Sequence, residues 1–129
     1  MDLALTGPVA LAERRLAWLD ARQRVLAANI ANADTPGFRP SDLPPFAELL
    51  ARRGAPRLAA TDPRHIVPAS AGLTARPDRL ALERTPDGNA VALDQQALRV
   101  AETDQQHALA MGLHRKYLAL FRIALGQHG

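Results

Sequence analysis

Residues 26–38 read Leu-Ala-Ala-Asn-Ile-Ala-Asn-Ala-Asp-Thr-Pro-Gly-Phe and mark the end of a helix. Pro36 disfavours helical backbone at Thr35, because the proline ring clashes with the residue before it. Pro36 and Gly37 suit the two central positions of a type II turn, in which Gly37 takes a positive φ. This stretch therefore predicts a helix that stops at a defined place and is followed by a tight turn ending at Phe38.

Asn29 and Asn32 lie three residues apart, on one side of the last helical turns. Their amides can satisfy the free carbonyl groups of the helix end, or they can bridge to a neighbouring segment. A solvated helix end followed by an ordinary turn explains the same residues, and on physical grounds alone it is the favoured interpretation.

The N-terminal helix is predicted over residues 8 to 33. Pro8 suits the first helical turn, and Thr6 or Gly7 can serve as its N-cap. Apolar residues recur in steps of four and three and form a heptad seam with one polar member: Leu5, Val9, Ala12, Leu16, Leu19, Gln23, Leu26 and Ile30. A second apolar line, made of Leu11, Trp18 and Val25, widens this face and indicates contact with more than one neighbouring helix.

The C-terminal helix is predicted over residues 91 to 125. Asn89 or Asp94 is expected to be its N-cap, and Gly126 stands where a left-handed residue usually ends a helix. Its predicted seam is apolar at both ends and polar in the middle: Leu93, Ala97, Val100, Asp104, His107, Met111, His114, Leu118, Phe121 and Leu125. Leu109, Leu113 and Leu120 lie off this seam.

Residues 39–90 hold eight of the ten prolines, which disfavour helices and central strands. A short helix over residues 46–53 and brief strands over 58–61 and 80–83 are the regular elements expected there. The predicted fold is mainly α: two long terminal helices pair as an antiparallel, coiled-coil-like hairpin, joined by an extended, proline-rich middle with little regular structure. Segments 1–38 and 91–129 together form one structural domain, and 39–90 is the middle segment.

Composition excludes several functional classes. The net charge is +3, but the 16 basic residues are spread along the chain among 13 acidic ones, whereas nucleic-acid binding needs a gathered basic face. No stretch is apolar for the roughly 20 residues that span a bilayer. The N-terminus lacks the basic region of a secretory signal peptide. We therefore expect a cytoplasmic protein, or one exported without a cleaved signal.

No catalytic, cofactor or metal site is predicted. The chain has no cysteine, and its two serines, Ser41 and Ser70, fall in the loop-like middle, away from a recognisable base. His107 and His114 share the predicted seam, but seven helical residues separate them by roughly 10.5 Å, too far for one zinc ion. We interpret them as polar spacers or interface donors.

The stretch ending in Thr35-Pro36-Gly37-Phe38 resembles the signature of the flagellar rod and hook proteins, in which an Asn-x-x-Asn segment precedes a Thr-Pro-Gly-aromatic turn. The version in this chain is most similar to that of the proximal rod. Two further segments, His65 to Pro68 and Asp87 to Asp94, resemble the same class, so the likeness covers nearly the whole chain. His107 departs from it by replacing an aromatic residue.

This resemblance implies a structural subunit of the flagellar basal-body rod, without enzymatic activity or cofactor. Such proteins are exported by the flagellar type III apparatus, assemble in the periplasm with copies of themselves and other rod proteins, and transmit motor torque. The proximal member lies near the membrane ring and export gate, so proteins of that junction are expected partners.

The terminal helices are predicted to form the assembly interface, because one antiparallel pairing cannot cover all their apolar lines. The predicted interface residues are Leu11, Trp18, Val25, Leu26, Ile30, Leu118, Phe121 and Leu125. Two alternatives remain open: another axial subunit of the rod and hook class, or a cytoplasmic coiled-coil adaptor or export chaperone. Detection in purified basal bodies would decide for the rod.

Overall fold

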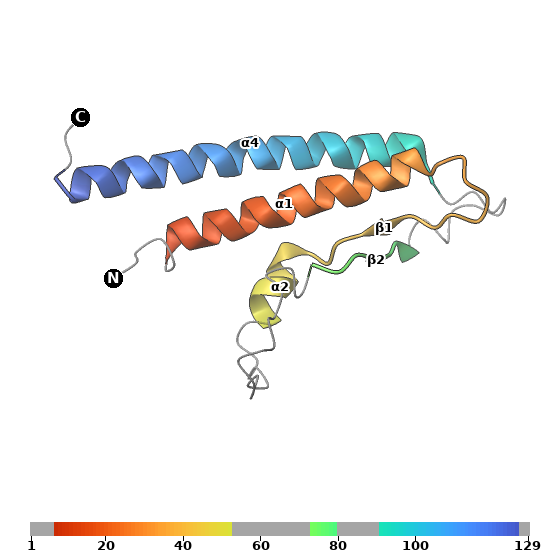
Figure 1. The fold of residues 1–129 in the computed structure, drawn as a ribbon, viewed down its shortest axis with the longest axis horizontal. Helices are drawn as coiled ribbons and strands as arrows, with labels where there is room; N and C mark the ends of the chain where they lie inside the picture. The colour runs from red at the N-terminus through yellow and green to blue at the C-terminus, as the bar shows by residue number, and fades with distance from the viewer. Residues whose placement is uncertain (1–6, 53–72, 80–90, 127–129) are drawn as a thin grey trace, which may run out of the picture.

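The computed structural model describes residues 7–52, 73–79 and 91–126. Two long helices, α1 (Pro8–Ala31) and α4 (Leu93–Ala124), lie side by side and run in opposite directions (Figure 1). The short elements lie along α1: β1 (Ser41–Asp42), α2 (Phe46–Arg52) and β2 (Arg76–Pro77). The prediction of a mainly helical chain with paired terminal helices is confirmed.

α1 begins at Pro8, and its N-cap is Gly7, one of the two predicted candidates. Gly7 has a positive φ of 83°. It ends at Ala31, two residues earlier than predicted. Asn32 causes this end, since its backbone N–H and its side-chain Nδ2 both donate to the Ala28 carbonyl, at 3.1 and 2.8 Å. The Ala28 carbonyl thus accepts both its ordinary helical bond and a second bond from the amide side chain, which fixes the last turn of α1.

The turn after α1 has the predicted geometry. The Phe38 N–H donates to the Thr35 carbonyl at 3.1 Å, and Gly37 has a φ of 74°. A Cβ at Gly37 would meet nothing within 4 Å, so glycine is needed here for its backbone angle and not for space. The turn sends the chain back along α1 (Figure 1).

α4 begins at Leu93, and its N-cap is Ala92 in extended conformation. The prediction of Asp94 as N-cap is wrong: Asp94 lies in the first helical turn, where its charge favours the helix dipole. The other candidate, Asn89, lies outside the described residues. At the C-terminal end Gly126 has the predicted left-handed backbone, with a φ of 73°.

The face of α4 that packs against α1 is displaced by one residue at three of the ten predicted seam positions. The buried positions are Gln96, Thr103 and Ala110, not their neighbours at 97, 104 and 111. Leu93 and Leu125, the predicted ends of the seam, are 52% and 64% exposed. Small and polar residues therefore face α1: Gln96 Oε1 accepts there from Asn29, whereas Thr103 Oγ1 donates to the Arg99 carbonyl of its own helix.

The α1 side of the pairing follows the prediction more closely. Val9, Ala12, Leu19 and Leu26 are buried, whereas Ile30 is 39% exposed. The polar member, Gln23, donates to Asp104 of α4. Leu5 lies outside the described residues.

The described part of the middle segment forms a layer of its own on α1. β1 and β2 pair antiparallel, with Ser41 opposite Pro77 and Asp42 opposite Arg76. Pro77 in this ribbon agrees with the sequence argument, which excluded proline only from central strands: a two-stranded ribbon has only edges, where a missing N–H is tolerated. The expected short helix is α2, whereas the strands expected over 58–61 and 80–83 lie outside the described residues.

The largest hydrophobic cluster lies between this layer and the two helices. Its buried members are Trp18, Leu19, Leu43 and Ala110. Partly buried residues of α1 and of the middle segment surround it: Leu16, Ala21, Val25, Phe46, Leu49, Leu73 and Ala75. The described part of the middle segment thus packs on α1 through this cluster.

Candidate assembly surface

Trp18 lies inside the subunit. Its side chain is 5% exposed, and its indole Nε1–H donates to the Pro44 carbonyl at 2.9 Å. The Phe46 ring packs beside it at a centroid distance of 6.2 Å. Arg15 lies over both rings, and its partial burial, with the nearby positive charge of Arg22, lowers the pKa of Arg15. The second apolar line of α1 is therefore covered here by the chain's own middle segment.

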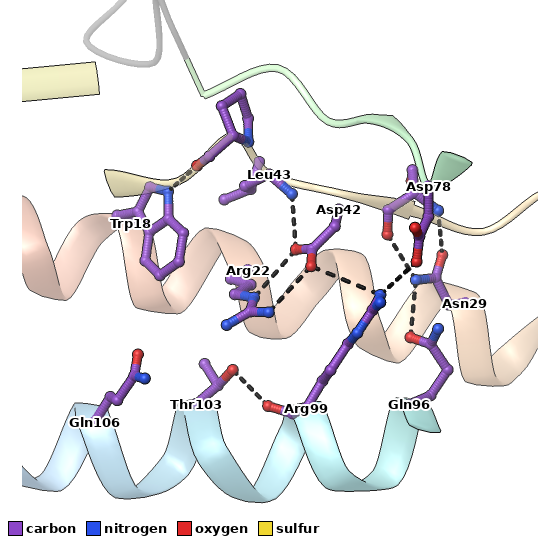
Figure 2. Close-up of polar contacts among 12 residues, drawn as sticks. Trp18, Arg22, Asn29, Asp42, Leu43, Asp78, Gln96, Arg99, Thr103 and Gln106 are labelled. Atoms are coloured by element: carbon purple, nitrogen blue, oxygen red, sulfur yellow. Dashed lines mark hydrogen bonds and ion pairs between the residues drawn. The ribbon is translucent and has the colours of Figure 1, made fainter. Parts of the chain in front are cut away.

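Asn29 is fully buried and joins three elements (Figure 2). Its Nδ2 donates to the Ser41 carbonyl at 2.7 Å and to Gln96 Oε1 at 3.1 Å, while its Oδ1 accepts from the Ser41 N–H at 3.0 Å. The amide thus pairs with the backbone of β1 as a strand would, and it also ties β1 to α4. Asn29 bridges to neighbours, whereas Asn32 caps its own helix.

Four charged side chains form a cluster between the ribbon and both long helices, here termed the charged clasp: Arg22, Asp42, Asp78 and Arg99 (Figure 2). Arg22 binds Asp42 through two parallel hydrogen bonds, at 3.1 and 3.0 Å. Arg99 reaches Asp78 at 2.6 Å and Asp42 at 3.8 Å. Because these side chains are only 8 to 22% exposed, water screens the pairs less than at an open surface.

Polar contacts between α1 and α4 fix the register of the pair. His107 lies 3.1 Å from Asp20, and His114 lies 3.4 Å from Glu13. Each histidine of the predicted seam thus faces a carboxylate of the other helix. Within the described residues no three side chains of the types that ligate metals gather into one group.

The structure divides the predicted interface residues into three groups. Trp18 and Leu26 are buried inside the subunit. Val25, Leu118 and Phe121 are half-buried. Leu11, Ile30 and Leu125 are exposed. Only the half-buried and exposed residues offer surface to a neighbour in this conformation. The two buried residues, Trp18 and Leu26, can therefore influence assembly only by stabilising the fold of the subunit.

The outer face of α4 carries the most exposed apolar surface among the described residues. Leu98, Leu109, Leu113, Leu120 and Ile123 are 59, 66, 43, 53 and 63% exposed. The sequence placed Leu109, Leu113 and Leu120 off the seam, but Leu98 and Ile123 were missed. Their spacing was the available signal, since positions 98, 109, 113, 120 and 123 follow one another in steps close to whole helical turns and so gather on one broad face of α4.

Comparison with known proteins decides the family. The profile described as "Flagella basal body rod protein" matches residues 11–39, which include the turn after α1. The flagellar basal body rod protein FlgB of Agrobacterium fabrum is 32% identical over 117 residues, covering 83% of this chain and 84% of that protein. The chain belongs to the FlgB family of flagellar basal body rod proteins. FlgB of Escherichia coli is 37% identical over 70% of this chain and 72% of its own, and FlgB of Salmonella typhimurium is 33% identical over the same shares.

The FlgB family is structural and not enzymatic, in agreement with the sequence-based prediction. Its matching region contains the motif residues Asn29, Asn32, Thr35, Gly37 and Phe38, which hold the turn and the first strand in place. Of the helices in the described ranges, none combines the length and the apolarity needed to cross a bilayer.

Proposed function

We propose that this chain is a structural subunit of the flagellar basal-body rod and that it assembles through the exposed faces of its two long helices. The observation that carries the proposal is the outer face of α4, where Leu109, Leu113 and Leu120 are exposed without a partner in the subunit. An apolar strip of this kind is typical of a surface that a neighbouring protein covers. FlgB relatives are rod proteins by name, and copies of this chain and other rod proteins are the neighbours we propose.

The resemblance to the rod and hook class supports the finer parts of the proposal. The subunit would leave the cell through the flagellar type III apparatus without a cleaved signal, join the rod in the periplasm near the membrane ring and export gate, and transmit torque. The paired helices suit a load-bearing part, because their contacts run along most of α1.

Basal-body purification tests the proposal. Strains whose only copy of the gene encodes either the wild-type chain or a variant are fractionated. Intact basal bodies are then purified and probed for the protein. We expect it in the rod fraction. The Leu109→Glu, Leu113→Glu double variant should be depleted there at least ten-fold, because burying unpaired charges costs several kcal/mol.

The Ala97→Glu, Ala108→Glu double variant, at exposed positions of α4 outside the line of Leu109, Leu113 and Leu120, is the matched control and should be incorporated normally. A discrete, soluble oligomer in the cytoplasm, with none of the protein in basal bodies, would instead support the adaptor or chaperone alternative.

A further inference from the structure

α4 has two apolar faces, and neither is fully covered. Close to its buried positions, three large apolar side chains are half-buried: Val100, Leu118 and Phe121. On the outer side three leucines, here termed the leucine face, are 66, 43 and 53% exposed: Leu109, Leu113 and Leu120. The buried positions themselves hold only Gln96, Thr103 and Ala110. Apolar burial alone therefore does not choose the face of α4 that packs on α1.

The leucine face lies only a short roll away from α1. Neighbouring residues of a helix are about 100° apart, so a roll of that size would carry Leu109 to the place of Ala110. The other two leucines would follow and leave the water, which is favourable for apolar surface. After Asp104, α4 carries no acidic residue that such a roll would bury. The observed rotation of α4 therefore depends on contacts that oppose the roll.

Two polar anchors lie near the start of α4, one helical turn apart (Figure 2). Gln96 is fully buried, and its Oε1 accepts from Asn29 Nδ2 at 3.1 Å. Its own Nε2 has no partner among the described residues, so this burial costs free energy that the bond from Asn29 offsets only in part. Arg99 binds Asp78 of the ribbon at 2.6 Å and reaches Asp42 at 3.8 Å.

These anchors are directional, whereas apolar contacts can be exchanged for one another. A hydrogen bond between two held groups forms at only one rotation of the helix, because it weakens steeply when its angle is lost. Asn29 belongs to α1, and Asp78 follows β2, so the two anchors hold α4 from two different elements. A buried polar contact that costs stability but fixes the register of paired helices is known from coiled coils.

We propose that Gln96 and Arg99 are positioning residues that hold α4 at the rotation in which its leucine face points outward. In its meaning for assembly this inference rests on the proposed function. Without the anchors α4 rolls, the subunit covers its own leucines, and the surface that a neighbour would bind is lost. The anchors act from a distance, since Arg99 and Leu109 are ten residues apart, or roughly 15 Å along the helix.

Thiol labelling of the isolated subunit tests the rotation, because the chain has no cysteine of its own. Leu109→Cys reports on the leucine face, and Ala110→Cys reports on the buried face, where Ala110 is 7% exposed. Each reporter is introduced with and without the Gln96→Ala, Arg99→Ala pair, and its rate of reaction with a maleimide is measured. Loss of the anchors should slow Leu109→Cys and speed Ala110→Cys, each by roughly ten-fold, since a minor state becomes the main one.

The matched control removes the same two residue types elsewhere on α4. Gln95→Ala, Arg115→Ala should leave both rates unchanged, since the structure shows no hydrogen bond or ion pair from either side chain to the described residues. A rescue chain adds Leu113→Ser and Leu120→Ser to the chain without anchors. It removes the apolar surface that favours the roll, so Ala110→Cys should become protected again.

Opposite changes of the two rates, together with the rescue, support the proposal. Unchanged rates, faster labelling at both positions or a failed rescue would overturn it, because the anchors would then hold the helices together without choosing the face. If circular dichroism shows that the double variant does not fold, Arg99→Ala alone decides by the same two rates, since it keeps the bond between Asn29 and Gln96. Absence of the wild-type chain from basal bodies would refute the proposed function and leave the labelling result unaffected.

Discussion

Asn29 and Asn32 occupy one side of the same helix end, yet the fold uses them differently. Asn32 donates to the Ala28 carbonyl at the end of α1. The sequence allowed this bond to be expected, because Asn32 stands in the last helical turn before Pro36. Asn29 bonds to Ser41 and Gln96, which lie 12 and 67 residues away along the chain. The sequence raised both possibilities but favoured a solvated end, because no local rule shows which distant backbone an amide will meet.

Replacing Asn29 should cost far more stability than replacing Asn32. Asn29→Leu leaves both backbone groups of Ser41 and the Gln96 amide oxygen without their partner, and we expect the free energy of unfolding to fall by about 3 kcal/mol. Asn32→Ala removes one partly exposed cap bond and should cost about 1 kcal/mol or less. Urea unfolding of the purified chain, followed by circular dichroism, measures both. Equal losses would contradict the bridging role of Asn29.

Two glycines should respond to alanine with opposite signs. Gly37 has a φ of 74°, and Gly112 lies inside α4, yet a Cβ at either position would meet nothing within 4 Å. Gly37→Ala should therefore lose about 1 kcal/mol through backbone strain alone. Gly112→Ala should gain about 1 kcal/mol through helix propensity. Thermal unfolding of both variants beside the wild type is the measurement, and a loss at Gly112 would indicate a contact that the subunit does not contain.

At the scale of elements, the boundaries of the helices followed from proline, glycine and asparagine, whereas the face of α4 did not. The sequence placed three of the ten seam positions at residues 97, 104 and 111, but Gln96, Thr103 and Ala110 are the buried positions. Thr103 Oγ1 donates to the Arg99 carbonyl within the helix, and Gln96 accepts from Asn29. Polar residues with such partners can be buried beside apolar ones, so the sequence pattern placed the buried line one residue off at these three positions.

The charged clasp should depend on arginine geometry and not only on positive charge. Arg22→Lys keeps the charge but loses the two parallel bonds to Asp42, so we expect the free energy of unfolding to fall by about 1 kcal/mol. Arg24→Lys, on an exposed position of the same helix, is the control and should change nothing measurable. Urea unfolding at low salt provides the comparison. Identical behaviour of the two variants would mean that positive charge alone suffices at Arg22 and that the parallel bonds add no stability.

At the scale of the whole molecule, the subunit is a helix pair with a third layer laid along α1. This layer covers Trp18, which the sequence alone assigned to a free apolar line. The free apolar surface lies instead on the outer face of α4 and at its tip. We therefore expect assembly to depend on the outer face of α4 and not on the face of α1 that contains Trp18. A two-helix hairpin alone would have left both faces exposed.

The single tryptophan reports whether this layer is in place. Phe46→Ala removes the ring that packs on Trp18, so we expect the fluorescence of the isolated subunit to shift to longer wavelength as water reaches the indole. The helical signal in circular dichroism should remain. Phe121→Ala, on the last turns of α4, is the control and should leave the emission unchanged. Loss of helix together with the shift would show that the layer and the helix pair unfold as one unit.

The sequence by itself determined the bounds of the long helices to within two residues and the turn at Gly37, because these follow from backbone rules that act within a few residues. The motif at this turn also indicated the family. Only the tertiary structure decided which face of α4 is buried, that β1 pairs with β2, and that Trp18 is internal. Each of these outcomes depends on bonds between residues far apart in the chain, such as Asn29 with Gln96 and Arg99 with Asp78. The energy of a buried amide or ion pair is favourable only once the fold has brought its partner to it.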